Sequence, residues 1–117
     1  FETSLKEGEI VTAVSFTAPA KAGYAKFPNP ASRYAMTGVF VAKDKEGVRV
    51  AVTGAGEGGV FRHKGLEAAF DKKFDASSVE GVKIESKGLM SDMHGSSEYR
   101  AALIRAMAKR AVAAAAA

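Results

Sequence analysis

Two apolar runs separated by a short polar turn constrain the fold of this chain most strongly. The first run spans residues 34–43, and the second spans residues 48–53. Between them lies Asp-Lys-Glu-Gly over 44–47, a polar stretch whose final glycine suits a turn. The valines of the second run occupy alternate positions, so they share one face of a strand. The pattern predicts an antiparallel hairpin with a short loop.

Further strands are expected before the hairpin. Residues 9–17 read Glu-Ile-Val-Thr-Ala-Val-Ser-Phe-Thr, which is β-branched and partly alternating, and Pro19 follows shortly after. This pattern predicts a first strand over 9–17. A short strand is expected over 24–27, and the Pro-Asn-Pro step over 28–30 then requires an extended, irregular turn.

The second half of the chain is predicted to be helical. Apolar residues recur at helical spacing over 66–74 and again over 99–112, and a short capped helix is expected over 75–82. We expect Tyr99 to be buried, Asp92 or Ser96 to cap the last helix, and the alanine tail to fray. Strands followed by helices predict an α+β fold, an antiparallel β-sheet with helices packed on one face.

Composition limits the classes of function. The chain has 117 residues, which suits a single domain over 1–117. It has no cysteine, which excludes disulfides and cysteine-ligated clusters within it and is compatible with the cytoplasmic location that we expect. No apolar run approaches the roughly 20 residues of a membrane span. The net charge is +4, but the basic residues are not interleaved with aromatic residues and do not form a known nucleic-acid-binding motif. We therefore expect no nucleic acid partner.

A glycine-rich stretch follows the hairpin. Gly54, Gly56 and Gly59 satisfy the G-x-G-x-x-G spacing that holds a pyrophosphate in dinucleotide-binding folds. That fingerprint requires a parallel βαβ unit, whereas the preceding strand belongs to an antiparallel hairpin. The favoured interpretation is a flexible turn leaving the sheet. A stand-alone module that binds an anion or nucleotide remains an alternative.

Residues for catalysis or metal binding are few. His63 and His94 are the only histidines, and their spacing gives no metal-ligand pattern. We expect His63 to be exposed and His94 to serve a capping or solvent role. Nothing marks an oxyanion hole or a nucleophile elbow near Ser96 or Ser97. The sequence therefore predicts no catalytic or metal-binding residue, and no catalysis by this chain alone.

Lys26 has two interpretations. It follows an aromatic residue on a short strand and precedes the rigid Pro-Asn-Pro segment. It is either a solvated lysine or a cation presented to an electron-rich ring or an anionic oxygen. A reduced flavin carries negative charge near its pyrimidine side, which a nearby cation would stabilise.

Three stretches, over residues 1–10, 23–35 and 92–100, resemble a known family. The match is to the C-terminal domain of the FAD-binding medium subunit of carbon monoxide dehydrogenase and its xanthine dehydrogenase relatives. The family's aromatic-then-lysine strand is matched by Tyr24 and Lys26. Its Asp…Ser…Tyr-Arg approach to the last helix is matched by residues 92–100.

The resemblance implies a role and a set of partners. It implies that the chain is a C-terminal fragment of a larger FAD-binding subunit and that Tyr24 and Lys26 flank the flavin. The upstream domains would hold the FAD pyrophosphate. An iron–sulfur small subunit with [2Fe-2S] clusters and a large subunit with the molybdenum cofactor would be the partners. Electrons would pass from molybdenum through the clusters to FAD and on to an acceptor.

Two positions depart from the family. Many members carry a basic residue where Asn29 stands and an acidic residue where Arg33 stands, so the sequence leaves open whether either contacts flavin. A structural interaction domain without a flavin role is therefore a second alternative. The substrate and electron acceptor of the parent enzyme are not indicated.

Overall fold

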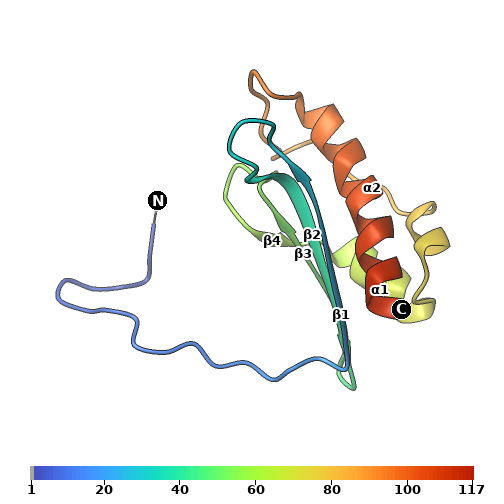
Figure 1. Ribbon diagram of the computed structural model, residues 1–117, viewed down its shortest axis with the longest axis horizontal. Coiled ribbons are helices and arrows are strands. Elements are labelled where there is room, and N and C mark those ends of the chain that lie inside the picture. The colour runs from blue at the N-terminus through green and yellow to red at the C-terminus, as the bar shows by residue number, and fades with distance from the viewer. Residues whose placement is uncertain (1) are drawn as a thin grey trace.

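The computed structural model describes residues 2–117, so the resemblance at Phe1 lies outside the described residues. Four strands precede the helices along the chain (Figure 1). In order, the elements are β1 (Lys21–Pro28), β2 (Ala35–Asp44), β3 (Gly47–Thr53), β4 (Phe61–Arg62), α1 (Lys64–Lys72), the 3-10 helix η1 (Ala76–Val79) and α2 (Ser97–Ala116).

The strands form one antiparallel sheet in the order β1-β2-β3-β4. The predicted hairpin is confirmed, since Lys43 pairs with Val48 and Asp44 pairs with Gly47. Gly47 adopts φ +121°, a backbone conformation that glycine reaches without strain. The α+β fold with an antiparallel sheet and helices on one face is therefore confirmed.

The core lies between the sheet and its helices, and α2 runs along β1 and β2 (Figure 1). Every second residue of β2 and β3 points toward the helices, as strand geometry requires. The helix packs so close to β1 that a Cβ added to Gly23 would lie 2.2 Å from the carbonyl oxygen of Ala111. Fully buried apolar residues of this layer include Val39, Val41, Val50, Val52, Leu66, Phe70, Ile104, Ala111 and Val112.

The expectation that the alanine tail frays is wrong for most of its length. Helix α2 continues to Ala116, and Ala115 is buried. The reason is the close approach at Gly23, where only small side chains on the helix fit against the strand. The alanines therefore form part of the helix–sheet contact.

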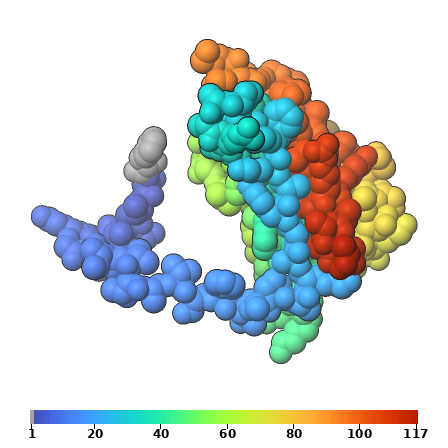
Figure 2. All heavy atoms as spheres, in the orientation of Figure 1, coloured from blue at the N-terminus to red at the C-terminus, as the bar shows by residue number. Residues whose placement is uncertain are grey.

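The strand expected over residues 9–17 is also absent. This segment is exposed and leaves the body of the molecule as an extended arm, as Figure 2 shows. Ile10, Val11, Val14 and Phe16 are each between 65% and 85% exposed. A strand needs a hydrogen-bonding neighbour, and no strand of the sheet pairs with the arm. The strand-like sequence is present without a partner.

Helix α2 differs in detail from the expectation. Ser96 is its N-cap, because its side chain accepts a hydrogen bond from the Tyr99 N–H at 3.1 Å, and this part of the prediction is confirmed. The expected burial of Tyr99 is wrong, since its side chain is 44% exposed. Arg100 next to it is buried instead, because the helix is rotated relative to the stripe inferred from the sequence.

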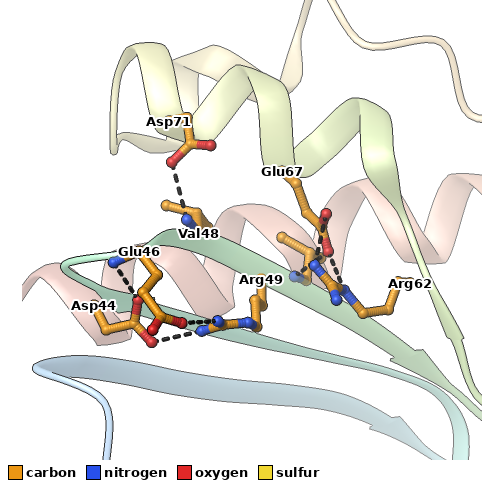
Figure 3. Close-up of polar contacts among 8 residues, drawn as sticks. Asp44, Glu46, Val48, Arg49, Arg62, Glu67 and Asp71 are labelled. Carbon is orange, nitrogen blue, oxygen red and sulfur yellow. Dashed lines mark hydrogen bonds and ion pairs between the residues drawn. The ribbon is translucent and has the colours of Figure 1, made fainter.

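Side chains of α1 bind backbone groups of β3, as Figure 3 shows. Asp71 accepts the N–H of Val48 at 2.9 Å, and Glu67 accepts the N–H of Val50 at 3.1 Å. Because β4 is only two residues long, it leaves part of the β3 edge unpaired. The two carboxylates supply acceptors there and fix α1 against the sheet.

Candidate functional site

The two residues assigned to a flavin site lie on the face of the sheet that the helices leave uncovered. Tyr24 pairs with Phe40, and Lys26 pairs with Gly38, while the intervening Ala25 turns toward the core. Positions i and i+2 of a strand lie about 7 Å apart on one face. The structure therefore brings Tyr24 and Lys26 together on one exposed surface, as strand alternation alone would require.

The ring of Tyr24 lies next to Gly38, where the sheet has no side chain. A Cβ added to Gly38 would lie 2.5 Å from the Tyr24 hydroxyl and 2.5 Å from Thr53 Oγ1. Thr53 Oγ1 is buried and has no hydrogen-bond partner among the described residues. The Tyr24 hydroxyl thus occupies the space above Gly38, next to the buried hydroxyl of Thr53, and the exposed part of the Tyr24 ring forms the surface here.

The ammonium group of Lys26 is anchored at the end of this surface. Its Nζ donates a hydrogen bond to the backbone carbonyl of Arg33 at 2.8 Å. Arg33 has φ +59°, which is uncommon for a residue with a side chain. Lys26 therefore presents its charge beside the β1–β2 loop on the exposed side of the sheet.

Asn29 explains the shape of that loop. It is 2% exposed, its N–H donates to the Tyr34 carbonyl at 2.8 Å, and its Oδ1 accepts the Ala31 N–H at 3.0 Å. The Arg33 N–H in turn donates to the Asn29 carbonyl at 2.9 Å. Asn29 and Arg33 are the two departures from the family pattern. Their hydrogen bonds therefore stabilise the conformation of the loop whose carbonyl binds Lys26.

The glycine-rich stretch does not form a dinucleotide-binding turn. Strands β3 and β4 on either side of it are antiparallel, and β4 separates the loop from α1. Gly54 has φ +74° and Gly59 has φ +96°. A Cβ on Gly54 would lie 2.0 Å from the Ala35 carbonyl oxygen, so this position requires glycine. The interpretation as a turn leaving the sheet is the one that fits the geometry.

The two histidines have different environments. The expectation that His63 is exposed is wrong, since it is half-buried and caps α1, its Nδ1 accepting the Leu66 N–H at 3.2 Å. Burial lowers the pKa of His63. Histidine is not among the preferred N-cap residues, so its role was not apparent from the sequence. His94 is exposed, and its N–H donates to Asp92 at 2.9 Å rather than capping the helix.

The Asp…Tyr-Arg motif joins the start of α2 to the sheet. Arg100, which is 1% exposed, donates to the carbonyl of Met36 at 2.6 Å and to that of Gly54 at 3.2 Å. Its other terminal nitrogen donates to both carboxylate oxygens of Asp92, at 2.9 and 3.0 Å. The motif residues are therefore structural.

Among residues 2–117, no group of three or more His, Cys, Asp or Glu side chains is arranged to hold a metal ion.

Comparison with solved structures finds three similar chains. No family model and no curated protein sequence matches the chain. The fold resembles a chain of carbon monoxide dehydrogenase from Hydrogenophaga pseudoflava, in a form that lacks the Mo-pyranopterin moiety of the molybdenum cofactor. The two superpose with a TM-score of 0.58 at 25% sequence identity, over 82% of this chain. The match spans 37% of the length of that dehydrogenase chain.

The similarity supports a domain related to the molybdenum hydroxylases. Within the part of the chain that the structure describes, no helix has the length and apolar character to cross a membrane.

Proposed function

We propose that this chain is the C-terminal domain of the FAD-binding subunit of a molybdenum hydroxylase related to carbon monoxide dehydrogenase. In the parent complex it would form one wall of the flavin site while FAD receives electrons from iron–sulfur clusters. The partners would be an upstream FAD-binding domain, an iron–sulfur small subunit and a molybdenum-containing large subunit, in the cytoplasm. The isolated chain would not be catalytic.

The observation that carries the proposal is the structural match to carbon monoxide dehydrogenase over 82% of the chain. Because the match spans 37% of that chain, it fits a part of a larger polypeptide. The match agrees with the resemblance of residues 23–35 and 92–100 to the same family.

The exposed arm supports a larger assembly. Ile10, Val14 and Phe16 are more than three-quarters exposed, and burying such side chains is worth about 1.5 to 3 kcal/mol each. An alternating, β-branched segment with no strand beside it fits pairing with a sheet outside this domain. An upstream flavin-binding domain is the partner that the proposal requires.

The uncovered sheet face supports a flavin wall. It combines the exposed ring of Tyr24 with the ammonium of Lys26. A partly apolar surface with a cation at its end suits a planar ring that becomes anionic on reduction. FAD would supply the electron-accepting ring, and Lys26 would stabilise its negative charge. No pyrophosphate cradle accompanies these residues, so we expect other domains to hold the rest of FAD.

The experiment is to purify the complete subunit that carries this chain and to measure bound FAD by its visible absorbance. We expect stoichiometric FAD in the complete subunit. By calorimetry, we expect the 117-residue chain to bind FAD and NAD no tighter than roughly millimolar, about 4 kcal/mol. A complete subunit without FAD would overturn the proposal and favour a structural interaction domain. Micromolar binding of either nucleotide by the chain alone would favour a stand-alone nucleotide-binding module.

A further inference from the structure

A second surface feature lies away from the sheet face described above. A cavity of about 470 Å³ opens between the β3–β4 loop and the segment 83–89. Its apolar lining comes from Phe61, Ile84, Leu89 and Ile104, and Gly56, Gly58 and Gly59 also line it. The volume lies within the range of small-molecule sites, which are concave and mostly apolar with a few polar groups.

The cavity is independent of the proposed flavin wall. Phe61 pairs with Val52, a core residue that faces the helices, whereas Tyr24 and Lys26 lie on the opposite face of the sheet. A ligand in the cavity would therefore not compete with a flavin near Lys26.

His63 supplies one polar group. Its Nδ1 accepts the Leu66 N–H, so a neutral imidazole must carry its proton on Nε2. Because burial lowers the pKa of His63, the neutral form prevails at pH 7. Nε2 makes no hydrogen bond to another described residue. His63 lines the cavity, and the helix cap fixes the neutral tautomer that carries an N–H donor on Nε2.

Two lysines add positive charge. Lys83 borders the cavity and pairs with Glu85 at 2.6 Å, while Lys87 also borders it and has no ion pair among the described residues. Two lysines and one glutamate leave one net positive charge along the lining. A monoanion would neutralise that charge, whereas a phosphate dianion would leave an excess of negative charge beside apolar walls.

We propose that this cavity binds a small monocarboxylate with an apolar body, such as an aromatic acid. The carboxylate would accept hydrogen bonds from His63 Nε2 and Lys87, and the hydrocarbon part would contact Phe61, Leu89 and Ile104. A neutral ligand of the same shape would leave both donors without an ionised acceptor, and charge-assisted hydrogen bonds are the stronger ones.

The test is a ¹H–¹⁵N NMR titration of the 117-residue chain at constant ionic strength, with benzoate, benzyl alcohol and inorganic phosphate as separate probes. We expect saturable, roughly millimolar binding of benzoate, as suits so small a ligand. The shifts should cluster in residues 56–65 and 83–89. Benzyl alcohol should bind about fivefold more weakly, and phosphate should not saturate. Benzoate shifts spread over the surface, or equal binding of benzyl alcohol, would overturn the proposal.

Variants test which residues bind benzoate. Lys87→Gln should weaken benzoate binding about threefold, because the lysine is exposed and its charge is partly screened. His63→Asn keeps a preferred N-cap side chain and removes the Nε2 donor, so it should also weaken binding while the helix remains. Lys45→Gln in the β2–β3 turn is the matched control and should bind as the wild type does. Equal losses in Lys87→Gln and Lys45→Gln would mean non-specific attraction to a basic protein and would contradict the proposal.

Discussion

Glu67 accepts the backbone N–H of Val50 at 3.1 Å, beyond the point where the two-residue strand β4 ends. Its side chain is 9% exposed and also receives hydrogen bonds from Arg62, as Figure 3 shows, and from Lys64. Asp71 binds the Val48 N–H one helical turn later. Helix α1 thus protects the edge of β3 with carboxylates, which limits edge-to-edge pairing with another chain.

The first prediction is a dependence of stability on Glu67 and pH. Burial raises the pKa of Glu67, but hydrogen bonds from Arg62, the Val50 N–H and Lys64 outweigh it and lower the pKa from 4.5 to about 2. The carboxylate therefore contributes stability above pH 4.5, and this contribution is lost as the pH falls toward 2. Its magnitude is about 2 kcal/mol, because the partner cations are largely exposed and screened.

Urea unfolding of wild type and Glu67→Gln at pH 7, 4 and 2.5 measures this effect. The variant should be less stable at pH 7, and the difference should shrink at each lower pH. Glu57→Gln, at an exposed position, is the control and should match the wild type throughout. A difference between wild type and Glu67→Gln that stays constant with pH would contradict the assignment.

The second prediction concerns Arg100. Its guanidinium donates hydrogen bonds to the Met36 and Gly54 carbonyls and to the Asp92 carboxylate at the same time, which a lysine ammonium cannot do in this geometry. Arg100→Lys should cost about 2 to 3 kcal/mol, because buried acceptors lose their donors. Arg110→Lys, on the exposed side of the same helix, should change stability by less than about 0.5 kcal/mol. Similar unfolding midpoints for the two variants in urea would show that the buried network contributes little.

The third prediction tests the close contact of α2 with β1. Gly23→Ala should destabilise the fold by about 3 kcal/mol, because the new methyl group would meet the helix backbone at Ala111. Gly81→Ala is the control, since nothing lies within 4 Å of its added Cβ. Thermal unfolding followed by circular dichroism would compare them. A Gly23→Ala protein as stable as the control would mean that the helix does not pack against this strand.

The fourth prediction concerns the start of α2. Ser96→Ala removes the acceptor of the Tyr99 N–H and should cost about 1 kcal/mol. Ser91→Ala, at an exposed position before the helix, should be neutral. Urea denaturation of both variants measures their free energies of unfolding. A loss of stability in Ser91→Ala but not in Ser96→Ala would mean that Ser96 is not the cap.

The sheet was predictable because its signals are local. The alternating valines of β3 and the polar turn at 44–47 are enough to define the hairpin, and alternation along β1 is enough to place Tyr24 beside Lys26. The helices α1 and α2 pack on one face because their apolar residues are buried against the same face of the sheet.

Other features depend on contacts distant in sequence. Residues 9–17 have strand propensity, but a strand forms only beside a partner, and the sheet offers none. The burial of Arg100 depends on carbonyls of Met36 and Gly54, more than 40 positions away, which no helical stripe reveals. Asn29 resembles any turn residue until its hydrogen bonds to Tyr34 are seen.

The most direct measurement of the central claim is the flavin midpoint potential of the complete subunit with Lys26→Met. If the Lys26 ammonium stabilises reduced flavin, its loss removes about 1 to 2 kcal/mol and lowers a one-electron potential by about 40 to 90 mV. Lys21→Met, at the exposed start of the same strand, is the control and should leave the potential unchanged. Redox titrations of the three proteins, each with full FAD, should show this single shift. Equal potentials for wild type and Lys26→Met would contradict the flavin-wall role.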